Sequence, residues 1–171
     1  MSRHANPPTA ARILVVADWK VDPEAVVAAL WRRAAEAGAV FTLLVPARLH
    51  GLDWVGDPTA SVPCARRQID RLAELCTRAG LAVEVAGVGD PDVLSAIGDA
   101  LEERVATEIV LFERRGRLGL HPLHLVHRAQ RATGRPAHRI EVPPSAGPRG
   151  RHGWTLPCAG GHCEAEGLQA A

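Results

Sequence analysis

The chain of 171 residues lacks any run of about 18 apolar residues, the length that a membrane-spanning helix needs. Its first twelve residues, MSRHANPPTAAR, also lack the apolar stretch of a secretory signal peptide. A strong charge of either sign is missing too, because the formal net charge is only +1. No overall electric field would therefore collect nucleic acid or an anionic membrane. We expect a cytoplasmic protein that binds neither.

Cysteine is scarce, tyrosine is absent, and Lys20 is the single lysine. Without an export signal, the four cysteines Cys64, Cys76, Cys158 and Cys163 are predicted to be free thiols. Cys64 and Cys76 lie twelve residues apart on one predicted helix, where small core residues are expected. Arginine replaces lysine throughout and alanine is abundant, so the basic residues reflect base composition rather than selection for phosphate binding.

Recognisable catalytic motifs are missing as well. The chain has no G-x-S-x-G, no Walker A lysine and no paired histidines with an acid. A phosphate-accepting receiver domain would need a lysine after its last strand, and Glu141-Val-Pro-Pro144 offers none. We therefore expect binding or sensing rather than catalysis, and a small-molecule hydrolase is the weakest alternative.

What the chain does contain is a regular alternation of apolar strands and amphipathic helices. A continuous apolar run, typical of a strand buried on both faces of a parallel sheet, occupies residues 12–18, and further strands are predicted over residues 39–45, 81–87, 108–112 and 138–142. Helical periodicity with caps occupies residues 22–38, 61–79, 90–101 and 120–133. This order predicts an α/β fold: a five-stranded, parallel, doubly wound sheet with four crossover helices.

The composition changes after residue 142. Of the 29 residues from Pro143 to Ala171, 10 are Gly or Pro, and no periodicity remains. Such a segment cannot bury enough apolar surface to fold alone. We predict an extension over residues 1–11, one domain over residues 12–142 and a disordered tail over residues 143–171.

A ligand site is expected at the carboxyl ends of the strands, where strand order reverses. If the first strand lies between the second and the fourth, Asp18-Trp19 and the turn Arg114 to Gly119 become neighbours. Asp18 could bind a base or ribose, and it could equally cap its own turn. The arginines of the turn could bind an anion, and they could equally be solvated. The candidate residues of this turn are Arg114, Arg115, Gly116, Arg117 and Gly119.

Three segments carry a resemblance to a known family. Ile13 to Asp18, then Gly87-Val-Gly89-Asp90-Pro91 before a helix, then Ala106 to Phe112 before an Arg/Gly-rich turn, resemble the universal stress protein family in order and spacing. The resemblance spans about residues 12–142. It implies a domain of the adenine nucleotide alpha hydrolase-like or Rossmann-like fold that takes part in the stress response and binds ATP or AMP. Asp18 with Trp19 would lie at the adenine, the main chain of Val45 would edge the base, and the turn would hold phosphates.

The phosphate motif departs from that family. Members that bind ATP carry a glycine, two residues, another glycine, nine residues, and then glycine with serine or threonine. Here Gly116 matches, Glu113 replaces the first glycine, and Val126-His127 occupy the last pair, which keeps His127 as a candidate contact. Lost glycines remove the close backbone approach to phosphates, and Glu113 adds a repelling charge. The chain is similar to a divergent branch of short stress-protein-like domains, common in high-GC bacteria, in which this ATP-binding motif is eroded.

No metal site is predicted. His121, His124 and His127 recur every three residues on one helix, but no acidic partner lies nearby, so surface histidines are expected. The tail residues His152, Cys158, His162 and Cys163 match no common zinc-finger spacing.

Two functions therefore stay open from the sequence. The first is a nucleotide-responsive regulatory domain that acts through contacts with an unknown protein partner. It would form a homodimer by pairing its last strand, residues 138–142, with that of a copy. The alternative is a structural or interaction module of the same fold that binds no nucleotide.

Overall fold

The computed structural model describes residues 10–48, 59, 61–114 and 122–145, and the domain limits given above stay predictions. Within these residues it contains five strands and four helices in strict alternation. In chain order they are β1 Ala11–Ala17, α1 Pro23–Ala37, β2 Ala39–Pro46, α2 Val62–Arg78, β3 Ala82–Gly89, α3 Val93–Glu103, β4 Glu108–Arg114, α4 Pro122–Thr133 and β5 Ala137–Val142.

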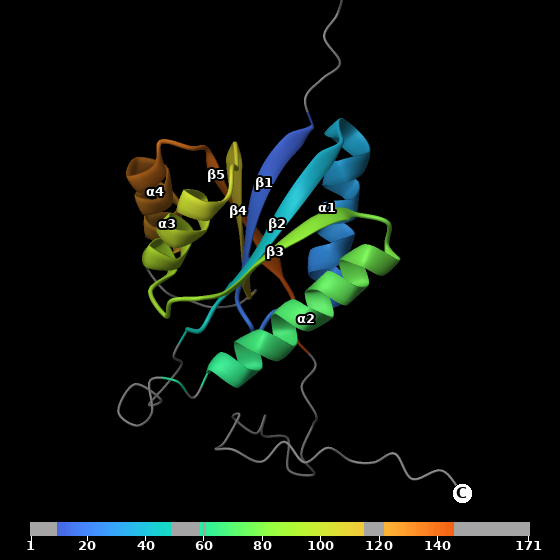
Figure 1. Cartoon of the computed structure of the whole chain (residues 1–171), viewed down its shortest axis with the longest axis horizontal. Coiled ribbons are helices and arrows are strands. Elements are labelled where there is room, and N and C mark those ends of the chain that lie inside the picture. Colours follow the sequence, from blue (N-terminus) through green and yellow to red (C-terminus); the bar gives the residue numbers. More distant parts are fainter. Residues whose placement is uncertain (1–9, 49–58, 60, 115–121, 146–171) are drawn as a thin grey trace, which may run out of the picture.

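All five strands lie in one parallel sheet with the order β3-β2-β1-β4-β5 (Figure 1). β1 is central and pairs with β2 through Arg12 and Val40 and with β4 through Val15 and Val110. The predicted α/β fold with a parallel, doubly wound sheet is therefore confirmed. The order reverses between β1 and β4, so the point where a ligand is expected lies between these two strands.

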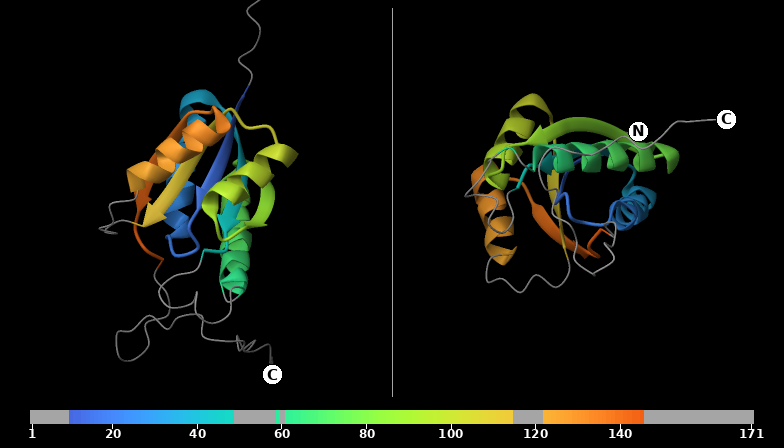
Figure 2. Two further views of the ribbon diagram at one scale, coloured as in Figure 1. Left: turned by 90° about the vertical axis from the view of Figure 1, so that its left-hand side faces the viewer. Right: turned by 90° about the horizontal axis from the view of Figure 1, so that it is seen from below.

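The helices cover both faces of the sheet, as Figure 2 shows in two directions. On one face Ile13 and Val15 of β1 pack in a cluster with residues of α1 and α2, and on the other Leu14 and Val16 pack with α3 and α4. This split follows from the two-residue alternation of a strand. It also explains the unbroken apolar run of β1, because both faces of a central strand are buried.

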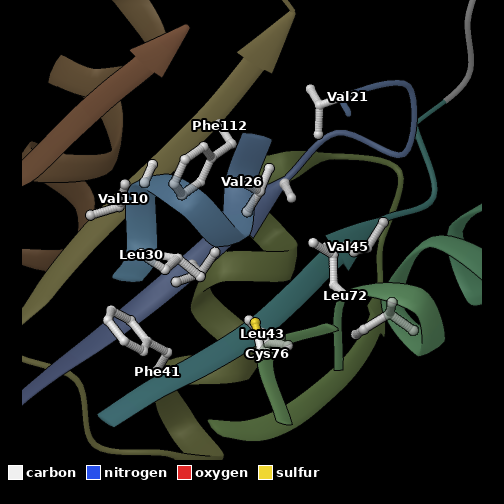
Figure 3. Packing of buried hydrophobic residues seen from close by; sticks show 14 of the residues in the cluster. Val21, Val26, Leu30, Phe41, Leu43, Val45, Leu72, Cys76, Val110 and Phe112 are labelled. Atoms are coloured by element: carbon white, nitrogen blue, oxygen red, sulfur yellow. The ribbon is translucent and has the colours of Figure 1, made fainter. Parts of the chain in front are cut away.

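The larger cluster lies between the sheet and α1 and α2 (Figure 3). Phe41 of β2 and Phe112 of β4 lie on either side of β1 and are almost completely buried. Leu30 of α1 and Leu72 of α2 are equally buried and belong to the same cluster. Phe112 ends this core at the carboxyl side of the sheet, next to the expected ligand site.

Two strands run further than the sequence predicts. β4 continues through Glu113 and Arg114, which pair with Glu141 and Val142 of β5. Both residues were expected to follow the strand, and both are part of it. β3 continues to Gly89 across a bulge opposite Leu43 and Leu44, and Gly87 has a φ of 121° that favours glycine. Pairing with a neighbouring strand decides both ends, and local sequence carries little information about it.

The cysteine prediction is partly wrong. Cys64 in the first turn of α2 is disulfide-bonded, and its partner lies outside the described residues. Cys76 is a free thiol with no exposed surface, and burial raises its pKa to about 11. It is the small core residue that was predicted. The sequence argument failed at Cys64 because an absent export signal says nothing about which thiols are brought together.

The start of α3 is set by Asp92, two residues after the predicted Asp90. The Asp92 carboxylate accepts hydrogen bonds from the main-chain N–H groups of Leu94 (3.0 Å) and Ser95 (2.9 Å). These bonds satisfy N–H groups that have no partner inside the helix. They also favour the charged form, so the pKa of Asp92 is lowered.

Asp92→Ala is expected to destabilise the protein by about 1 kcal/mol near neutral pH, because the cap is lost. Since the pKa of this carboxyl is lower in the folded state, its stabilisation is complete above the unfolded-state pKa of about 3.9 and is lost as pH falls through the folded-state pKa. Urea unfolding of both proteins at several pH values measures this. Asp99→Ala, which removes an exposed charge from the same helix, is the control. A loss for Asp92→Ala that does not depend on pH would contradict the assignment.

The chain after β5 returns to the β1–α1 connection. Asp22 donates its N–H to the Pro143 carbonyl (2.9 Å), and Ser145 donates its N–H to the Lys20 carbonyl (2.8 Å). The rest of the predicted tail lies outside the described residues. No helix in the part of the chain that the structure describes is long and apolar enough to cross a membrane.

Candidate ligand crevice

The carboxyl ends of β1 and β4 meet at the edge of the sheet that is lowest in Figure 1. Ala17 is the partner of Phe112 in the sheet register, and Asp18 donates its N–H to the Phe112 carbonyl at 3.3 Å. The ends of the first and fourth strands are therefore neighbours, as expected, whereas residues 115–119 of the predicted turn lie outside the described residues. The position of the site in the fold depends on this contact.

A small hollow lies on the α3 and α4 side of these strand ends. Its walls come from the ends of β1, β2 and β4 and from α3 and α4, so five elements far apart in sequence contribute to it. The lining residues are Val16, Asp18, Pro46, Arg48, Val93, Leu111, Phe112, Glu113 and Leu125. Most of this surface is apolar, and the three charged side chains stand at the strand ends.

Asp18 is the most deeply buried of these charges, with 8% of its surface exposed. One carboxylate oxygen, Oδ1, accepts the main-chain N–H of Lys20 at 2.9 Å. The other, Oδ2, lies 3.7 Å from Nη1 of Arg48. Asp18 thus caps its own turn and also faces the hollow, so the two roles left open by the sequence are compatible in one side chain.

Trp19 ties the end of β1 to the end of β2. Its indole Nε1 donates a hydrogen bond to the Arg48 carbonyl at 3.0 Å, and Lys20 Nζ lies 4.6 Å from the centre of its ring. The ring packs against the core on the α1 side and is not among the residues that line the hollow. Trp19 therefore anchors the main chain of Arg48 and does not line the hollow.

Glu113 lines the hollow, but a neighbouring strand compensates its charge. Glu113 Oε2 lies 2.9 Å from Nε of Arg139 on β5, and Arg139 also pairs with Glu141. The alignment at Nε is too poor for a hydrogen bond, so the contact with Glu113 is electrostatic. The repulsion of phosphates that the sequence suggested for Glu113 is weakened accordingly, because an opposite charge stands beside it.

The other predicted contacts are placed differently. Val45 is fully buried in the core with α1 and α2, and its main chain pairs with Val88 of β3. Arg114 is exposed, and strand alternation places its side chain on the opposite face from Glu113. His127 is exposed on α4 and does not line the hollow. The remaining candidates, Arg115, Gly116, Arg117 and Gly119, lie outside the described residues.

Arg48 is the site residue that the sequence analysis missed. It follows β2 by two residues and continues the alternation of Leu44 and Pro46, so it reaches the same face of the sheet as Asp18. That alternation could have identified it. The connection after β2 was instead treated as a loop without a defined direction.

Metal ligands do not gather in the described part of the chain. No group of three or more His, Cys, Asp or Glu side chains there is arranged to hold a metal ion. His121 and the four candidate ligands of the tail lie outside the described residues. Among the described residues, the charges that line the hollow are those of Asp18, Arg48 and Glu113.

The fold and the hollow define a class of protein: an open, parallel α/β sheet with a crevice at the reversal point of its strands. Comparison with known proteins refines this class. No family model matches the chain, and no curated protein matches it in sequence. Solved structures do match.

A protein of the universal stress protein family from Burkholderia pseudomallei aligns at 22% identity, covering 75% of this chain and 94% of that one, with a TM-score of 0.50. A universal stress protein in complex with cAMP aligns at 16% identity, covering 78% of this chain and 99% of that one, with a TM-score of 0.51. This chain therefore has the universal stress protein fold. The resemblance seen in the sequence is confirmed at the level of the fold.

Proposed function

We propose that the chain is a regulatory domain that binds an adenine nucleotide, or a related small anion, in the crevice between β1 and β4. The observation that carries this proposal is the contact between Asp18 and Phe112 at the reversal point of the sheet, with a hollow directly beside it. The similar structure with cAMP supports adenine compounds as the first ligands to test. Its output would be a contact with a protein partner rather than a reaction.

The residues around the small hollow carry groups that could contact such a ligand at the strand ends. Val16, Leu111 and Leu125 offer apolar surface for a flat base, and the Asp18 carboxylate can accept hydrogen bonds from an amino group or a ribose hydroxyl. Arg48 adds a positive charge within the same hollow. A base with an attached anion would find a complementary group for each part.

The experiment is equilibrium dialysis with ATP, AMP and cyclic AMP, combined with thermal unfolding. A ligand at 100 times its Kd should stabilise the folded protein by about 2.7 kcal/mol. Asp18→Asn is expected to weaken binding on the order of 10- to 100-fold, the value of a hydrogen bond to a charged group. Its amide oxygen can still accept the Lys20 N–H, so the turn should stay folded, whereas Asp18→Ala would leave that donor without an acceptor.

The control is Asp70→Asn, which removes the same charge from the exposed face of α2. It should leave both binding and stability unchanged. Equal affinity of the Asp18→Asn and wild-type proteins would refute the assignment of Asp18. Failure of the wild-type protein to bind any of the three nucleotides would refute the nucleotide proposal itself.

A homodimer is the second part of this proposal. β5 pairs only with β4 in the described part of the chain, so its other side is an open edge. An open edge can add the same strand from a copy around a twofold axis. Ile140 is only partly buried there, which leaves apolar surface for such a contact.

The second candidate function, an interaction module that binds no nucleotide, is favoured by a different observation. Trp31 of α1 is 56% exposed beside a groove between α1 and α2 that Val27, Ala28 and Leu75 also line. A large exposed aromatic side chain beside a partly apolar groove can mark a contact surface. A null result in the nucleotide titrations would favour this function.

A further inference from the structure

In the part of the crevice that the structure describes, the positive charge comes from the residue two positions after β2. Among the described residues that line the hollow, Arg48 is the one cationic side chain. Arg114, the described member of the predicted cluster, extends from the other face of β4. Among the described residues, Arg48 is therefore the cation placed to contact an anion in the hollow.

Three hydrogen bonds hold the main chain at Arg48 and at the residue before it. Trp19 Nε1 donates to the Arg48 carbonyl at 3.0 Å. At the preceding residue, Ala47 donates its N–H to the Gly89 carbonyl at 3.0 Å, and its own carbonyl accepts the Ser61 hydroxyl at 2.6 Å. A side chain on an anchored backbone loses less freedom when it binds a ligand, so the position is preorganised.

The guanidinium of Arg48 still has donors to offer. Its Nη1 lies 3.7 Å from Asp18 Oδ2, which is close enough for charge attraction but too far for a hydrogen bond. The guanidinium donates no hydrogen bond to a described residue, although it carries five N–H donors. With 27% of its side chain exposed, it can rotate toward a ligand while Asp18 stays within range. A planar fork of donors suits the oxygens of a phosphate group.

The acid on the β4 wall does not compete for Arg48. Glu113 is paired with Arg139 of β5, so its charge is compensated on the far side of the hollow. Apolar residues such as Val16 and Leu111 line the hollow between these two ion pairs, one at Arg48 and one at Glu113. Charge attraction is stronger over such a surface than in open water.

We propose that Arg48 binds the phosphate of a phosphate monoester ligand in this crevice, as a side-chain substitute for the eroded glycine-rich turn. This inference rests on the proposed function and names the ligand class more narrowly. The ligand carries a flat, mainly apolar group that lies over the mouth of the hollow beside Asp18. It also carries a phosphate that reaches the β2 wall.

The test compares AMP with adenosine, which lacks the phosphate, and with inorganic phosphate alone, by isothermal titration of the full chain. Arg48→Met keeps an unbranched side chain in place of the arginine's aliphatic stem but removes the charge and the donors. It is expected to weaken AMP binding on the order of 10- to 100-fold. Adenosine affinity should stay unchanged, and Arg48→Lys should weaken AMP binding to an intermediate degree.

The matched control is Arg66→Met, which removes the same charge from the exposed face of α2 and should change neither affinity. Urea unfolding of each variant reports whether the fold is kept. Undiminished AMP binding by Arg48→Met overturns the inference, and so does an equal loss for AMP and adenosine, which would indicate a merely structural role. A wild-type protein that binds adenosine and AMP equally well overturns it too, and the proposed function survives. A wild-type protein that binds none of the probes overturns both.

Discussion

Phe112→Ala is expected to destabilise the protein by about 3–5 kcal/mol, because it empties a large space in a core that cannot close around it. Only 1% of Phe112 is exposed, and its ring packs in the cluster with Val110, Val26 and Leu30 in Figure 3. Its carbonyl accepts the N–H of Asp18, so the same residue supports the end of β1. Loss of the ring should therefore weaken ligand binding as well as stability. Urea unfolding and AMP titration measure the two effects separately.

Phe112→Leu keeps most of the buried volume and should cost less than about 1.5 kcal/mol. Val105→Ala changes an exposed side chain and should lie within about 0.5 kcal/mol of the wild type. If Phe112→Ala were no less stable than Phe112→Leu, the packing described for this core would be wrong.

Gly89→Ala is expected to destabilise the protein by about 1–3 kcal/mol through overpacking. Gly89 ends β3 where α3 crosses it, and an added Cβ would lie 2.6 Å from Ala96 Cβ and 2.9 Å from Leu44 Cδ1. The leucine can rotate away, but Ala96 is fixed to its helix. Either α3 must shift or the strand end must bend, and both border the crevice through Val93 and Pro46.

Gly98→Ala is the matched control, because Gly98 lies in α3 with nothing within 4 Å of an added Cβ. It should stabilise the protein by about 0.5–1 kcal/mol through helix propensity. Thermal unfolding of both variants provides the comparison. A Gly89→Ala protein as stable as Gly98→Ala would show that the close approach of β3 and α3 is absent.

The strand and helix pattern was largely predictable because it depends on local periodicity. The apolar run before Asp18 indicated a central strand, and Gly38 and Gly80 after their helices indicated where those helices end, both with the positive φ expected of such glycines. Asp18 was predictable for the same reason, since a polar residue that ends a central strand lies at the edge where ligands bind. These inferences require no knowledge of distant contacts.

The remaining features of the site were not predictable in this way. The extension of β4 to Arg114 depends on pairing with β5, and the compensation of Glu113 depends on Arg139 from that strand. Arg48 was overlooked, although its alternation with Pro46 placed it on the correct face. The prediction that Cys64 is a free thiol was wrong, because it depended on the expected compartment and not on which thiols the fold brings together.

By itself the sequence determined which segments form strands and helices and that these alternate, because burial patterns repeat every two or 3.6 residues along the chain. Only the tertiary structure decided which charges share the crevice. Asp18 meets Arg48, and Glu113 meets Arg139, across intervals of about 30 residues that no local pattern spans. The physical reason is that sheet order and register bring these side chains together, and both are set by packing of the whole domain.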